Sequence, residues 1–227
     1  MTAVPTLPPP RRERGGEATR QRILAAAEQE FAAKGFDGAR LASIARGAKA
    51  PQALIHHYFG DKDGLHRAVF ERVLASIATE SFRILETKAP PRRRAKGARF
   101  GRPELEALVH AFVGLLVDFY TQNAHVLRIL GHELGRSGSL ADELVKTRLG
   151  PQLDDIVARL DAMKLAGEVR ADVDGRHLCI STVAMACFPT MDEAFLGALW
   201  GLDPRSPEFV AARKREIAAT VLARIAP

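Results

Sequence analysis

The chain has 227 residues, enough for one medium-sized domain or for a small domain joined to a larger one, and 47% of them are hydrophobic, so a core can form. Its formal net charge of +6 suits an anionic partner such as DNA, although charge alone identifies no partner. No run of about 18 uncharged apolar residues occurs, and the N-terminus lacks the apolar core of a secretory signal. We therefore expect a cytoplasmic protein with no membrane partner.

Two cysteines, Cys179 and Cys187, are the only ones in the chain. If they share a helix, their eight-residue separation places them about 12 Å apart, too far for a disulfide. We expect two reduced thiols, as the cytoplasm would maintain.

The N-terminal region begins with a basic arm and continues into a helix. Residues 1–17 are rich in Pro and Arg and hold too few apolar side chains to offset the entropy of ordering, so we expect a flexible arm. Apolar residues then recur at four-residue spacing, at Ile23, Ala27 and Phe31. This pattern predicts a helix over residues 19–34, with Gly35 as its stop.

Two short helices are expected next. An apolar stripe at i, i+3, i+4 and i+7 comprises Leu41, Ile44, Ala45 and Ala48. It predicts a two-turn helix over residues 41–48. Pro51 suits the first position of a further helix because its missing N–H would have no partner there, and we place that helix at residues 51–58.

A long helix and a basic segment follow. Asp61 can cap a helix whose apolar stripe runs from Leu65 to about Leu85. Residues 86–103 then carry seven basic residues against the single acid Glu86, and we interpret them as a solvated linker. Further helices are expected at residues 104–122, 124–135, 139–165 with a break at Pro151, 174–200 and 206–225. Neither strand-like alternation nor a fixed repeat interrupts them, so the sequence predicts an all-α protein.

The pair of helices at residues 41–48 and 51–58, with the first helix behind them, fits a helix-turn-helix, whose second member lies in the major groove of DNA. Two short amphipathic helices are by themselves more often plain core packing. More specific are the stretches Thr19 to Leu24, Phe31 to Phe36, Ile44-Ala45, His57 to Phe59 and Lys62 to Leu65. In type, spacing and order, and without a gap, they resemble the N-terminal domain of the TetR/AcrR family of regulators.

This resemblance implies a homodimer that binds a double-stranded DNA operator and, in most family members, represses transcription until a ligand releases it. It implies a helix-turn-helix DNA-binding domain at residues 18–64, a connecting helix at 65–85, and a helical ligand-binding and dimerisation domain at 104–227. Beyond Leu85 the resemblance lies only in helical character and length.

Candidate DNA contacts follow from the third helix. If Ile55 and Phe59 face the core, then Gln52, Ala53 and His56 project outward. Gln52 can pair bidentately with adenine, and Ala53 can meet the methyl group of thymine. His56 and His57 could donate to phosphate or to a base acceptor, although His57 is about equally suited to packing, partly buried, against the first helix.

Lys62 and Arg40 are expected to contact phosphate. Lys62 lies in the first turn of its helix, where free N–H groups and the helix dipole attract anions, and where the family usually has a lysine. Arg40 stands where the family usually has a small hydroxyl residue, so it could keep a phosphate contact but not the helix cap. Lys49 replaces a turn glycine and Pro51 a cap serine. If residue 49 needs a positive φ, the lysine costs about 1 kcal/mol.

The C-terminal region offers apolar side chains for a pocket that would take a small apolar or amphipathic effector, although such residues more often fill a core. The pocket candidates are Phe112, Leu116, Phe119, His125, Met163, Met185, Cys187 and Phe188, with Leu127, Leu130, His132 and Met191 as further ones. By the resemblance, the last two helices make the dimer interface with Val183, Phe195, Leu199, Trp200, Val210, Ile217, Val221 and Leu222. An intramolecular bundle without a partner is the alternative. However, two DNA-binding domains that contact successive major grooves about 34 Å apart require a dimer.

Other functional classes find less support in the sequence. It contains no Gly-rich phosphate loop and no G-x-S-x-G, H-E-x-x-H or C-x-x-C motif, so we expect no enzyme, catalytic residue, cofactor or metal. The alternative function is non-specific nucleic-acid binding through the Arg- and Lys-rich linker, which competition with random duplex would distinguish.

Overall fold

The computed structural model describes residues 11–88, 101–134 and 140–227, with side chains for residues 15–79, 101–133 and 142–227. The chain divides into two compact units, residues 1–72 and 73–227. Every regular element in the described residues is a helix, which confirms the predicted all-α class. None of the described helices combines the length and the apolar character that a membrane span needs.

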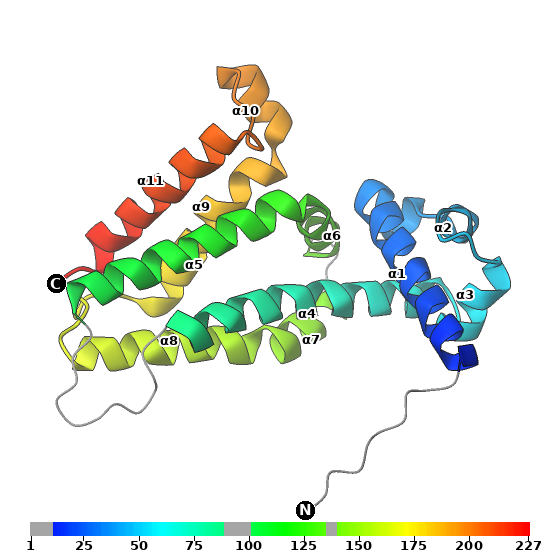
Figure 1. Ribbon diagram of the computed structural model, residues 1–227, viewed down its shortest axis with the longest axis horizontal. Helices are drawn as coiled ribbons and strands as arrows, with labels where there is room; N and C mark the ends of the chain where they lie inside the picture. The colour runs from blue at the N-terminus through cyan, green and yellow to red at the C-terminus, as the bar shows by residue number, and fades with distance from the viewer. Residues whose placement is uncertain (1–10, 89–100, 135–139) are drawn as a thin grey trace, which may run out of the picture. The chain divides into compact units, whose positions relative to one another are not determined.

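The first unit packs two short helices against a longer one. It contains α1 (Arg11–Gly38), α2 (Leu41–Gly47), α3 (Gln52–Phe59) and the beginning of α4 (Lys62–Lys88), and α2 and α3 each contact α1 (Figure 1). Its core consists of apolar side chains at the predicted helical spacing. They include Ile23, Leu24, Ala27, Phe31, Ile44, Ile55, Leu65, Val69 and Phe70, all buried.

The first helix is longer than predicted. It begins at Arg11, so residues 11–17 are helical, although we expected them in the arm; residues 1–10 lie outside the described part. Within this extension the Thr19 hydroxyl donates to the Gly15 carbonyl at 2.9 Å, and Gln21 donates to Glu17 at 2.7 Å. The predicted stop is confirmed, since Gly35 has a φ of 64°, outside the helical region.

α4 is joined to α1 by an aromatic cluster and an ion pair. The ring of His66, which is buried, meets Phe31 and Phe36 edge-on, with ring centroids 4.8 and 4.9 Å apart. Further along α4, Arg72 pairs with Glu28 at 2.9 Å. Burial raises the pKa of Glu28, and the positive charge of Arg72 opposes that rise. These contacts fix the beginning of α4 on the first unit.

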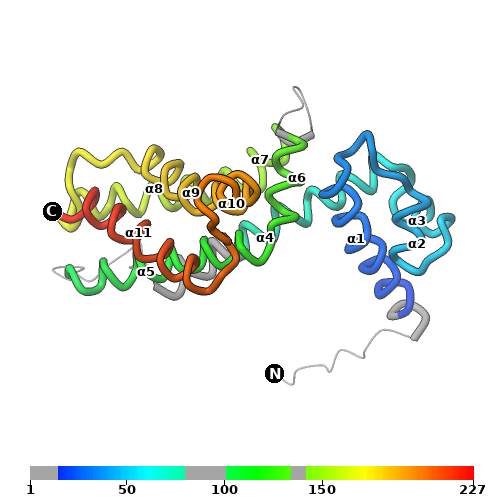
Figure 2. The backbone as a smooth tube through the Cα atoms, turned by 90° about the horizontal axis from the view of Figure 1, so that it is seen from above, coloured from blue at the N-terminus to red at the C-terminus, as the bar shows by residue number. Residues whose placement is uncertain are grey.

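The second unit is a bundle around α9. Its helices after α4 are α5 (Arg102–Gln122), α6 (Ala124–Leu134), α7 (Leu140–Arg148), α8 (Gly150–Leu165), α9 (Gly175–Met191), α10 (Glu193–Trp200) and α11 (Pro207–Ile225). α5, α9 and α11 pack against one another, while α6, α8 and α10 also contact α9 (Figure 2). Ile217 and Val221, predicted in the dimer interface, are buried in this unit's own core beside Val113 and Ala186.

Two of the predicted helices are divided in the structure. The expected break near Pro151 is confirmed, since α7 ends at Arg148 and Pro151 lies in the first turn of α8. The single helix predicted over residues 174–200 is wrong. It is divided at Asp192, whose side chain accepts a hydrogen bond from the Phe195 N–H at 3.1 Å and so starts α10.

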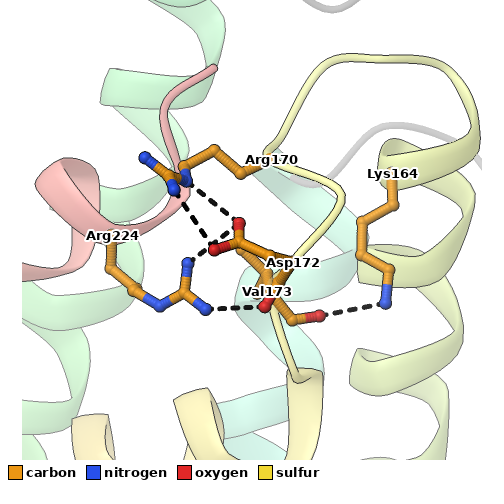
Figure 3. A network of polar contacts seen from close by, with 5 residues as sticks. All are labelled: Lys164, Arg170, Asp172, Val173 and Arg224. Carbon is orange, nitrogen blue, oxygen red and sulfur yellow. Dashed lines mark hydrogen bonds and ion pairs between the residues drawn. The ribbon is translucent and has the colours of Figure 1, made fainter.

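A polar clamp ties the turn between α8 and α9 to the end of α11 (Figure 3). Arg170 donates two hydrogen bonds to the Asp172 carboxylate, at 3.0 and 3.1 Å, and the Arg170 N–H donates to the Ile225 carbonyl at 2.9 Å. Arg224 donates to the same carboxylate and, at 2.7 Å, to the Asp172 carbonyl. Hydrogen bonds from Arg170, with Arg224 assisting, lower the pKa of Asp172 to about 2.

Candidate DNA interface

The third helix turns one apolar residue inward and a polar face outward. Ile55 is fully buried, whereas Gln52, Ala53 and His56 are exposed. Phe59 is half-buried, with the Arg20 guanidinium 5.4 Å from the centre of its ring. The predicted orientation of α3 is therefore confirmed, and its outward face is free to enter a groove.

The turn between α2 and α3 is a Schellman motif. The Ala50 N–H donates to the Ala45 carbonyl at 3.0 Å, and the Lys49 N–H donates to the Arg46 carbonyl at 3.1 Å. Lys49 has a φ of 51°, in the left-handed region that this motif normally fills with glycine. From α1, Arg22 donates to the Ala48 carbonyl at 3.2 Å. The lysine thus accepts the strained conformation, and the turn keeps its geometry.

Pro51 lies one residue before the position we predicted. It is the residue that precedes α3, with φ −59° and ψ 139°, and the helix begins at Gln52. Proline supplies no side-chain oxygen to cap the helix, so the first N–H groups of α3 find no acceptor on the Pro51 side chain. These N–H groups lie beside Gln52 and Ala53, which places backbone donors at the N-terminal end of α3.

The two histidines at the end of α3 differ in their contacts. The Nδ1 atom of His56 lies 2.9 Å from the Gly60 carbonyl oxygen, which can only accept, so Nδ1 carries the proton. In the neutral ring Nε2 is then an acceptor. His57 is exposed and meets Tyr58 edge-on at 5.0 Å. The alternative in which His57 is partly buried is wrong.

Lys62 and Arg40 lie on either side of α3 in the chain. Lys62 is the first residue of α4, its ammonium group lies 4.7 Å from the centre of the Phe36 ring, and it donates to the Asp37 carbonyl at 3.4 Å. Arg40 is exposed and precedes α2, and among the described residues its side chain makes no cap hydrogen bond, as we predicted.

A residue of α1 performs the capping instead. The Glu30 carboxylate accepts from the Arg40 N–H at 3.3 Å and from the Lys34 ammonium at 2.8 Å. These bonds, the one from Lys34 above all, together with one from the Ser43 side chain, lower the pKa of Glu30. Sequence reasoning missed Glu30 because the cap comes from a different helix.

The pocket candidates do not gather at one place. Phe112 and Met163 line a cavity of about 90 Å³ among α5, α8, α9 and α11, and Phe119 borders a broader hollow of about 670 Å³ between α4 and α5. The other candidates lie elsewhere: Leu116 is buried in the core, Met185 and Cys187 pack against it, His125 is half-buried, and Phe188 is exposed. Most of the lining of the smaller cavity, including Arg159 and Thr182, was not predicted.

The fold and the exposed face of α3 together define a helix-turn-helix DNA-binding protein. The profile of bacterial regulatory proteins of the tetR family matches residues 23–69, and that of the tetracyclin repressor-like C-terminal domain matches residues 106–221. The chain belongs to the TetR family, and it is a DNA-binding transcriptional regulator.

Relatives and solved structures agree with this assignment. The HTH-type transcriptional regulator BetI of Paraburkholderia phymatum is 26% identical over 69% of this chain and 84% of its own. The HTH-type transcriptional repressor NicS of Pseudomonas putida is 24% identical over 85% of each chain. The ketosteroid transcriptional regulator KstR2 of Mycobacterium tuberculosis has the same fold, with a TM-score of 0.65 at 17% identity over 92% of this chain and 95% of its own. So has FadR of Bacillus subtilis, solved with stearoyl-CoA, with a TM-score of 0.65 at 13% identity over 90% of this chain and 98% of its own.

Proposed function

We propose that this regulator is a cytoplasmic, homodimeric repressor that binds a palindromic operator and leaves it when a small effector binds the second unit. The observation that carries this proposal is the outward face of α3, whose Gln52, Ala53 and His56 side chains are exposed beside the buried Ile55. Relatives described as repressors, NicS among them, support repression, and FadR with its bound stearoyl-CoA supports an effector site.

Base reading falls to three side chains of α3. Gln52 would donate to and accept from adenine, and Ala53 would contact a thymine methyl group. Since Nδ1 of His56 donates to the Gly60 carbonyl, the neutral ring offers Nε2 as an acceptor. We therefore assign His56 to an amino group of adenine or cytosine rather than to a phosphate, which would need the protonated ring.

Phosphate contacts fall to residues around the reading helix. The contacts of Lys62 with Phe36 and Asp37 hold its ammonium group at the N-terminus of α4, where it would bind a phosphate oxygen. Arg40 and His57 are exposed and would add further contacts. The phosphate contacts would supply affinity and position the protein on DNA, and the base contacts of α3 would supply sequence specificity.

Dimerisation would use apolar side chains that the second unit leaves exposed. They lie on α9 and α10 and comprise Ile180, Phe188, Met191, Phe195, Leu199 and Trp200. This α9/α10 surface shares Phe195, Leu199 and Trp200 with the interface we predicted, and exposed apolar side chains grouped in this way are typical of protein interfaces.

Selection of bound duplexes from a random pool tests operator binding directly. We expect one enriched palindromic motif, and a pool without a motif would contradict the proposal.

With the selected operator, Gln52→Ala should lose about 1 to 3 kcal/mol of discrimination at one base pair of each half-site. Lys62→Ala should weaken all duplexes alike and reduce the salt dependence. Lys146→Ala, an exposed lysine on α7, is the matched control and should change neither quantity.

A further inference from the structure

The cavity of about 90 Å³ in the second unit is lined almost entirely by carbon. It lies where α5, α8, α9 and α11 meet, and its lining consists of aliphatic side chains, Phe112, Met163 and three residues with polar atoms, which are Arg159, Cys179 and Thr182. Whether the cavity takes a charged, a polar or an apolar ligand depends on what those three residues can still offer.

The polar groups of the lining are already engaged. Arg159 donates to the Asp155 carboxylate at 3.0 Å, and this carboxylate is buried, so an anion that bound Arg159 in the cavity would have to compete with a buried ion pair. The Thr182 hydroxyl donates to the Leu178 carbonyl at 2.8 Å within α9. Burial raises the pKa of the Cys179 thiol, which stays neutral and bonds weakly. The lining therefore favours a ligand without charge.

We propose that this cavity binds a small uncharged apolar molecule or group, no larger than a single hydrocarbon ring. A cavity of about 150 Å³ with similar walls in another protein stays dry and holds benzene. The smaller volume here fits a short alkyl group as it stands, and a ring once Met163, an adaptable side chain, moves. The effect of this ligand on the operator rests on the proposed function, whereas its binding does not.

The first experiment uses benzene as the probe and Cys179 as the reporter. In the full-length Cys187→Ser protein at alkaline pH, where part of the Cys179 thiol is ionised, a maleimide should label Cys179, and benzene at ten times its dissociation constant should slow this labelling about tenfold. Benzoate, of similar size but charged, should leave the rate unchanged. The matched control is Cys179→Ser, in which labelling of Cys187 should be unaffected by benzene. Equal protection by benzoate, or none by benzene, would overturn the proposal.

The second experiment tests the size of the site. Phe112→Ala removes a lining ring, so naphthalene should bind this variant about tenfold more tightly than the parent, measured by the same protection of Cys179. Phe209→Ala, a half-buried phenylalanine outside the lining, is the matched control and should leave naphthalene binding unchanged. An equal gain in both variants would overturn the assignment of the ligand to this cavity.

Binding in both experiments is measured without DNA, which separates the two proposals. If benzene does not protect Cys179 but the protein binds an operator, the proposed cavity ligand is contradicted and the proposed repressor function is not. If benzene protects Cys179 but no operator is enriched, the proposed repressor function is contradicted and the proposed cavity ligand is not.

Discussion

Gly64 lies in the first turn of α4, where no side chain fits. A Cβ atom at this position would lie 2.0 Å from the carbonyl oxygen of Phe59, the last residue of α3. We predict that Gly64→Ala lowers the free energy of unfolding by more than about 2 kcal/mol, because the backbone that joins α3 to α4 must move. Urea denaturation measures this. The matched control is Gly114→Ala inside α5, where, apart from its chain neighbours and the backbone of α5 itself, no described atom lies within 4 Å of the added Cβ. This substitution should stabilise by up to about 1 kcal/mol.

The conformation at residue 49 was predictable, and the surroundings of His57 were not. The resemblance placed a turn glycine at Lys49, and the structure has a φ of 51° there. Spacing on a helix gives the direction of a side chain, which sufficed for Ile55 and Gln52. It does not show how far neighbouring helices extend over the end of an eight-residue helix. The His57 side chain near the end of α3 is exposed.

At the scale of the element, α2 depends on a carboxylate from α1. The Glu30 pKa is lowered below its ordinary value of 4.5, so the folded state holds the charged form more strongly than the unfolded state does. The stability that it contributes is therefore present above pH 4.5 and lost as the pH falls through the lowered pKa. We predict that Glu30→Gln costs about 0.5 to 1 kcal/mol at pH 7, as for a lost helix cap under solvent screening, and progressively less below pH 4.5. Urea titrations at several pH values measure it, and a difference that stays constant down to pH 3 would contradict the role.

A proline inside α9 creates a second dependence between helices. Pro189 has no N–H, so the carbonyl of Met185, four residues earlier, lacks its helical donor. The Arg213 guanidinium of α11 donates to this carbonyl instead, at 2.8 and 3.1 Å. Burial lowers the pKa of Arg213, with Glu216 opposing.

The two residues should therefore be coupled. We predict that Arg213→Met costs about 1.5 to 3 kcal/mol in the parent, because a charged donor to a half-buried carbonyl is lost. In a Pro189→Ala background the N–H of the introduced alanine can serve the Met185 carbonyl, so the same substitution should cost less by at least about 1 kcal/mol. Urea denaturation of the four proteins gives the coupling energy. Equal costs in both backgrounds would mean that Arg213 acts elsewhere.

Helix periodicity predicted most elements because each helix has its own apolar stripe. Periodicity did not predict the division at Asp192, because apolar residues continue on both sides of it and only the cap geometry separates α9 from α10. The cavity escaped for a different reason. Its lining joins residues as distant in the chain as Leu105 and Ile225, and no local pattern specifies which residues of separate helices meet.

At the scale of the molecule, the proposed recognition of a palindromic operator would need two copies of the chain. Trp200, Leu199 and Phe195 are 67%, 51% and 49% exposed, although they are apolar and belong to one short helix. Ile217 and Val221 are unavailable for a partner because they are buried in their own unit. The three exposed residues, which belong to the α9/α10 surface, are therefore the part of the predicted interface that is most accessible to a second copy.

We predict that Trp200→Asp yields a monomer by sedimentation analysis, because a carboxylate cannot be buried in an apolar interface without a partner. The substitution is at an exposed position, so the helix content in circular dichroism should be unchanged. Operator affinity should fall by a factor of about 10² to 10⁴, because a monomer loses the avidity of two linked DNA-binding domains. Leu165→Asp is the control, because Leu165 is 92% exposed at the end of α8 and outside the α9/α10 surface. This variant should remain dimeric with its operator affinity intact, whereas a dimeric Trp200→Asp protein with parental affinity would move the interface to another face.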